Sequence, residues 1–161
     1  MALPQGNGKV LDLHGMSRLR QTIDGELAAW NTVAQHEAFT VTGVVEVFSI
    51  IDVTETVASA GAAEISFGRE GDTDAYAAAQ VVTGLTAGQL VNPGGTVITA
   101  RGLDAYQAAG AALPIHHVIA DLDIGYEVTV AALNNGLIDW YLWWRPLSDD
   151  GRVVLGTGAA F

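Results

Sequence analysis

The chain has 161 residues, of which 50% are hydrophobic and 16% are charged, and it contains no cysteine. This length fits one domain that buries about two-thirds of its unfolded surface. The absence of cysteine excludes disulfides, thiolate nucleophiles and cysteine-ligated zinc, and the formal net charge of -11 argues against binding to nucleic acid, whose phosphates would repel the chain.

The charged fraction is low for a soluble domain, where about 25% is usual. Such a surface is poorly solvated, so we expect other copies or a larger partner to cover part of it. A composition bias from a GC-rich genome is the alternative explanation. No apolar stretch approaches the roughly 18 residues of a membrane span, and residues 1–15 lack the apolar core of a signal peptide. We therefore expect a protein that is made in the cytoplasm and has no membrane partner.

Residues 1–37 predict an extended or partly helical N-terminal arm. A short helix is expected between Asp24 and His36, with Asp24 as N-cap and apolar residues three apart on one face. The first 22 residues are basic, with three cations against Asp12. The cations, which we assign to a partner or oligomer interface, are Lys9, Arg18 and Arg20. A solvated, mobile tail is the alternative for this segment.

Residues 38–147 predict the β domain. The first strand candidate runs from Phe39 to Ile51, and it is followed by further short candidates separated by Gly, Asn and Pro. These candidates are residues 55–60, 62–68, 96–101, 114–121, 126–133 and 137–145. Such spacing is typical of an all-β fold, an antiparallel β-sandwich or jelly-roll-like domain. Residues 72–80 are expected to form a helical turn or short helix, and the apolar C-terminal tail, residues 148–161, to add to a neighbour's sheet.

Three of the four tryptophans lie between Leu137 and Arg145, directly after Asn134-Asn135-Gly136. The Asn-Gly pair predicts a tight hairpin turn, with residues 126–133 as the partner strand. Period-two alternation predicts one apolar face made of Ile138, Trp140, Leu142 and Trp144. The opposite face carries Tyr141, Trp143 and Arg145, which we assign to a partner or oligomer interface; stacking of the two aromatic rings on sugars is the alternative.

No catalytic motif stands out. The serines lie outside any Gly-x-Ser-x-Gly elbow, and no phosphate-binding loop is present. His116 and His117 precede Asp121 and Asp123, but adjacent strand residues point to opposite faces, so a shared metal site is disfavoured. The carboxylates of residues 70–74 lack the spacing of an EF-hand loop, and capping by Asp72 or Thr73 explains them more simply. We expect no enzyme activity, metal or cofactor.

Several segments together resemble small virion proteins of tailed bacteriophages, of the capsid decoration or cement type, which are encoded near the major capsid protein. The similarity covers roughly residues 38–154 in order. It rests on Phe39-Thr40-Val41-Thr42-Gly43-Val44-Val45, on Ala63-Glu64-Ile65-Ser66-Phe67-Gly68 leading into Gly71-Asp72-Thr73-Asp74-Ala75, and on Gly136-Leu137-Ile138-Asp139-Trp140 leading into Trp144-Arg145-Pro146-Leu147-Ser148 with Asp150-Gly151.

The resemblance implies a β-rich structural protein of the virion that binds the outer capsid surface, commonly as a homotrimer, and clamps adjoining copies of the major capsid protein. It carries no catalytic residues. The alternatives are a phage tail or head-completion component and a carbohydrate-binding module that attaches the virion to a host.

Overall fold

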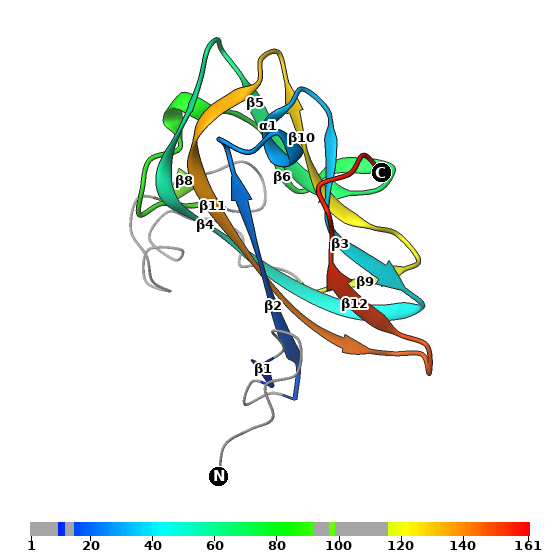
Figure 1. Ribbon diagram of the computed structural model, residues 1–161. Helices are drawn as coiled ribbons and strands as arrows, with labels where there is room; N and C mark the ends of the chain where they lie inside the picture. Colours follow the sequence, from blue (N-terminus) through cyan, green and yellow to red (C-terminus); the bar gives the residue numbers. More distant parts are fainter. Residues whose placement is uncertain (1–9, 12–14, 92–96, 99–115) are drawn as a thin grey trace.

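A computed structural model describes residues 10–11, 15–91, 97–98 and 116–161 of the chain. Two antiparallel sheets pack face to face, and this arrangement confirms the predicted all-β sandwich (Figure 1). Helical structure in these residues is limited to one turn at α1 (Ala28–Asn31) and a 3₁₀ turn, η1 (Val82–Gly84). Neither helix of the described part is long and apolar enough to cross a membrane.

Sheet A is the larger sheet, and its centre is the long pair of β4 and β11. Its order is β1 (Val10–Leu11), β2 (Ser17–Asp24), β11 (Leu133–Pro146), β4 (Val44–Ser59), β7 (Leu90–Val91) and β8 (Val97–Ile98). The first residues of β4 pair instead with β9 (His117–Ala120). In Figure 1, β2, β11 and β4 run side by side across the molecule.

Sheet B closes the other side of the sandwich. Its order is β12 (Arg152–Leu155), β3 (Gln35–Thr42), β10 (Ile124–Thr129), β5 (Glu64–Arg69) and β6 (Asp72–Val81). The chain therefore alternates between sheets, so that strands far apart in sequence become neighbours. Sheet B leaves β6 and β12 at its two edges.

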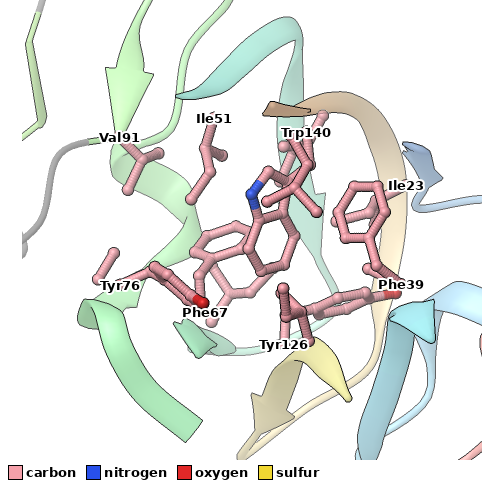
Figure 2. Close-up of a cluster of buried hydrophobic side chains, with 14 of the residues drawn as sticks. Ile23, Phe39, Ile51, Phe67, Tyr76, Val91, Tyr126 and Trp140 are labelled. Carbon is pink, nitrogen blue, oxygen red and sulfur yellow. The ribbon is translucent and has the colours of Figure 1, made fainter. Parts of the chain in front are cut away.

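The core between the sheets is centred on Trp140 of β11, which is fully buried (Figure 2). Phe39 and Phe67 of sheet B meet its ring edge-on, with centroids 5.6 Å and 5.2 Å away. Tyr76 adds a third edge-on contact at 6.0 Å. Edge-to-face packing suits the charge distribution of aromatic rings, so this cluster both fills the core and fixes how the two sheets face each other.

The structure differs from the predicted N-terminal arm over residues 17–37. Strand β2 lies inside sheet A between β1 and β11, and it buries Leu19 and Ile23 in the core. The predicted helix is reduced to the four residues of α1, and Asp24 accepts a hydrogen bond from Glu26 N instead of capping it. Removing residues 1–22 would thus delete most of a core strand. The remainder of the predicted arm lies outside the described residues, apart from Val10, Leu11, Gly15 and Met16.

The predicted hairpin at Asn134-Asn135-Gly136 is wrong. Strand β11 starts at Leu133 and continues through this sequence with irregular register against β4, while β10 belongs to sheet B. Gly136 has a φ of +106°, and a Cβ on it would lie 2.6 Å from the Cα of Val57. Glycine is therefore needed here because two paired strands approach closely at a bulge. A bulge of this kind and a tight hairpin turn both require a residue with positive φ.

Two further predictions are corrected. Residues 72–81 form the edge strand β6 instead of a helix, because the preceding Glu70-Gly71 turn folds them back onto β5. The C-terminal tail also belongs to the domain, since β12 pairs with β3 of the same chain instead of a neighbour's sheet. The predicted strand at 96–101 is described only at Val97–Ile98, which form β8.

Candidate docking surface

Strand β11 divides its side chains between the two faces of sheet A, and the period-two prediction is confirmed. The inward set is almost fully buried and consists of Ile138, Trp140, Leu142 and Trp144. On the outer face, Tyr141 and Trp143 are half-buried and Arg145 is exposed. Asp139 departs from the simple pattern, because it lies on the outer face but is only 3% exposed.

Three aromatic side chains form a row on this outer face, and we call Phe48, Trp143 and Tyr141 the aromatic strip. Trp143 pairs with Phe48 of β4, and their rings meet at 5.5 Å and 66°. The rings of Tyr141 and Trp143 lie 6.2 Å apart and are inclined by only 35°. Each of the three is half-buried, so packing holds the rings in place while part of every ring remains open to a partner.

Two arginines of β2 flank the aromatic strip. The guanidinium carbons of Arg18 and Arg20 lie 5.9 Å and 6.0 Å from the centroid of the Tyr141 ring, within cation–π range. Arg20 also forms an ion pair with Asp139 at 2.8 Å, and this contact raises the pKa of the Arg20 guanidinium. Thr22 donates a second hydrogen bond to Asp139 at 2.7 Å, so the buried carboxylate is satisfied from both sides.

At the other end of the aromatic strip, Glu46 of β4 contacts two side chains, Arg145 and His116. Arg145 of β11 contacts one carboxylate oxygen, and His116 Nδ1 lies 2.7 Å from the other. Hydrogen bonds from His116 and Arg145 hold the pKa of the Glu46 carboxyl below its ordinary value. The ring of His116 also contacts Phe48, with centroids 5.4 Å apart. Glu46, Arg145 and His116 therefore lie next to the aromatic strip on the same face of sheet A.

The structure brings together five of the six residues assigned to an interface from sequence. Arg18, Arg20, Tyr141, Trp143 and Arg145 all lie on the outer face of sheet A, drawn from β2 and β11. The sixth, Lys9, lies outside the described residues.

Sequence reasoning missed the contribution of β4 and the residue before β9 to this surface. Glu46 and Phe48 alternate with the buried Val45 and Val47, and that alternation could have placed them on the outer face. Pairing Phe48 with Trp143 needed the register of β4 against β11, which no local pattern carries.

The two adjacent histidines point to opposite faces, as the strand geometry predicts. His116 is exposed beside Glu46, whereas His117 meets the ring of Tyr76 edge-on at 4.8 Å. Burial lowers the pKa of His117. In the described part of the chain, no three His, Asp or Glu side chains are placed to hold one metal ion.

Three of the carboxylates considered as metal ligands, Asp72, Asp121 and Asp123, contact other groups of the protein. Asp121 accepts a hydrogen bond from Gly43 N at 2.6 Å, and Asp123 accepts one from Val41 N at 2.9 Å. Burial of Asp123 raises its pKa. Asp72 forms a 3.7 Å ion pair with Arg69 at the β5–β6 turn, and Thr73 donates to Glu127 at 3.0 Å. These contacts attach turns and loop ends to neighbouring strands.

Comparison of the chain with protein-family models, with curated proteins and with solved structures finds no match.

Proposed function

We propose that this chain is a structural protein of a tailed-phage virion that decorates the outer surface of the capsid. The observation that carries the proposal is the outer face of sheet A, where the aromatic strip is combined with arginines. Partly open Trp, Tyr and Arg side chains on a rigid support are the residues that most often dominate protein interfaces. The resemblance of residues 38–154 to decoration proteins supplies the partner, the major capsid protein.

The role follows from multivalent contact. A β-sandwich held by a continuous aromatic core offers a stiff body, so the energy of docking is not lost in ordering the surface. If three copies act together, as in the homotrimers that the resemblance implies, each capsid-bound copy raises the effective concentration of the others. Binding several capsid subunits at once then opposes their separation under internal pressure. The virion exterior is accordingly the proposed location.

A second candidate is attachment to carbohydrate. The specific observation in its favour is that the Tyr141 and Trp143 rings are neighbours on one face, with centroids 6.2 Å apart and planes inclined by 35°, because adjacent aromatic rings can stack on sugars. A phage tail or head-completion role would use the same surface against another virion protein.

The test uses capsids that lack this protein, incubated with the purified chain and then sedimented. Wild-type chain should co-sediment, and Trp143→Ala should bind at least about tenfold more weakly, as expected at an interface hot spot. Leu155→Ala is the matched control, since Leu155 is a large exposed apolar residue of β12 in the other sheet. Its binding should equal that of the wild type.

Failure of wild-type chain to bind capsids would overturn the decoration proposal. Glycan-array binding that Trp143→Ala abolishes, without capsid binding, would establish the carbohydrate candidate in its place.

A further inference from the structure

The last six residues, 156–161, form what we call the C-terminal segment, and they continue alongside β3 after β12 ends. Gly156 N donates to Ala38 O at 2.8 Å, and Gly158 N donates to Glu37 O at 3.0 Å. In return, Glu37 N donates to Ala159 O at 2.8 Å. The C-terminal segment thus covers the backbone edge of β3 beyond the reach of β12.

One buried side chain ties this segment to the body of the domain. His36 of β3 is 2% exposed, and its two ring nitrogens face two backbone carbonyls. Nδ1 lies 3.1 Å from Gly158 O, and Nε2 lies 2.8 Å from Thr32 O. The imidazole therefore bridges the C-terminal segment and the chain that follows α1.

The chemistry of this bridge depends on the proton count of the ring. A carbonyl oxygen only accepts, so each nitrogen of His36 must carry a proton to make its bond. Neutral imidazole has one N–H and imidazolium has two. In the neutral ring, the nitrogen without a proton would point its lone pair at a carbonyl oxygen. The ring is buried, and leaving a buried polar group without a hydrogen bond costs stability. The bridge is complete only with imidazolium.

The surroundings can accommodate the positive ring. His36 stacks on Tyr126 of β10, with centroids 4.9 Å apart and planes inclined by 22°, and Trp30 stacks on Tyr126 at 6.4 Å. A cation over an aromatic face is stabilised by the ring quadrupole. Burial opposes this effect, because it disfavours any charged form.

In the described residues, few ionisable groups lie close enough to His36 to affect its protonation. Tyr126, the titratable group that faces it from β10, donates its hydroxyl to Trp30 O at 2.5 Å, and burial raises its pKa, so it stays neutral. Residues 32–34 and 156–160 contain no ionisable side chain. Glu37, next along β3, accepts a hydrogen bond from Thr40. The two carbonyls are thus the polar groups that respond to the proton.

We propose that His36 is a proton-operated latch on the C-terminal segment. With the proton bound, the ring holds Gly158 and Thr32 together. When the proton leaves, one N–H remains, and the bond to Thr32 is kept because it is the shorter and because Thr32 is only four residues away in the chain. The bond to Gly158 is lost, so the latch is closed while the ring carries two protons and opens when one of them leaves.

Opening has a structural consequence that goes beyond capsid docking. If the C-terminal segment leaves, the backbone of β3 at Glu37 and Ala38 loses its partners. An unpaired strand edge is a template for pairing with another chain. Because the three backbone hydrogen bonds to β3 do not depend on the proton, opening the latch would weaken the cover over this edge and so favour its pairing with a strand of a second copy.

The test is a nuclear magnetic resonance titration of the full chain, labelled with ¹⁵N, between about pH 5 and 8. The ring nitrogens of His36 should both appear protonated at the acid end, and one should lose its proton at the alkaline end. Amide exchange at Gly158, expressed as a protection factor so that intrinsic pH effects cancel, should fall about tenfold over the same range, as expected for a lost charged hydrogen bond.

Two variants separate the latch from general effects of pH. His116→Gln removes an exposed histidine and should keep the pH-dependent fall at Gly158. His36→Gln, whose amide does not titrate, should give protection that is low and independent of pH. An unprotonated ring nitrogen at about pH 5 in the folded chain, or an equal fall in His36→Gln, would overturn the proposal. If His36→Gln does not fold, the wild-type ring spectrum and the Gly158 protection factors decide.

Discussion

The carboxylate of Asp139 is buried on the outer face of sheet A and lies 2.8 Å from the guanidinium of Arg20, whose own side chain is 56% exposed. The pair joins β11 to β2 beside the aromatic strip. A solvent-facing cation therefore neutralises a carboxylate that water barely reaches.

The first prediction concerns this pair. Arg20→Leu should lower the free energy of unfolding by about 1 to 3 kcal/mol, because it leaves a buried carboxylate with Thr22 as its remaining side-chain donor. Arg18→Leu is the control, since Arg18 stands at the same distance from Tyr141 but forms no ion pair with a described residue. It should change stability by less than about 0.5 kcal/mol. Urea denaturation measures both, and equal losses would show that stacking on Tyr141 matters more than the ion pair.

The second prediction contrasts two tryptophans of β11. Trp140→Ala should cost about 3 to 5 kcal/mol of fold stability, because it empties the centre of the core. Trp143→Ala should leave a folded domain and weaken assembly. Thermal denaturation and sedimentation check both. Loss of the fold in Trp143→Ala with a stable Trp140→Ala would place the core on the wrong face of β11.

The third prediction tests the bulge in β11. Gly136→Ala adds a Cβ at 2.6 Å from Val57 Cα as well as a strained positive φ, so it should destabilise the fold by more than about 2 kcal/mol. Gly71→Ala has a comparable positive φ but open space around the new Cβ. That control should cost only the backbone strain of about 1 to 2 kcal/mol. If urea denaturation shows similar losses of stability in the two variants, β4 can move away from the new Cβ at little cost.

The fourth prediction concerns stability and pH at His117, whose pKa is lowered by burial. The unfolded chain then binds a proton more readily than the folded one, so this histidine favours the fold above the ordinary histidine pKa of about 6.5 and costs stability as pH falls below it. His117→Gln should flatten the acid side of the curve of melting temperature against pH. An unchanged curve in His117→Gln would contradict the assignment.

The fifth prediction is that folding needs no divalent metal. Asp72 pairs with Arg69 at the β5–β6 turn, and we expect neither Asp72 nor Asp74 to need a metal, so the melting temperature should stay unchanged when a chelator is added. A drop on chelation that calcium restores would turn these carboxylates into ligands.

The strand alternation of β11 could be predicted because it is local. Side chains on a strand point alternately to either face, so the positions of Trp140, Trp143 and Trp144 follow once a strand is assumed. The abundance of short apolar runs with turn residues between them likewise led to the correct all-β class.

Local sequence patterns gave a wrong prediction where two different backbone structures require the same residue type. The Asn135-Gly136 pair indicated a hairpin turn, but it lies within β11, where Gly136 needs its positive φ for a bulge against Val57. Strand β2 was predicted as part of an arm, although Leu19 and Ile23 fit a strand pattern. Its partner β11 comes more than a hundred residues later, and nothing near β2 indicates that pairing.

What the sequence determined by itself was the fold class, the buried face of β11 and the residue types available for docking. The tertiary structure alone decided which strands are neighbours, and hence that Arg20 meets Asp139, that Phe48 meets Trp143 and that His36 reaches Gly158. The reason is physical: backbone hydrogen-bonding groups are the same in every residue, so the choice among distant partners depends on how the whole core packs.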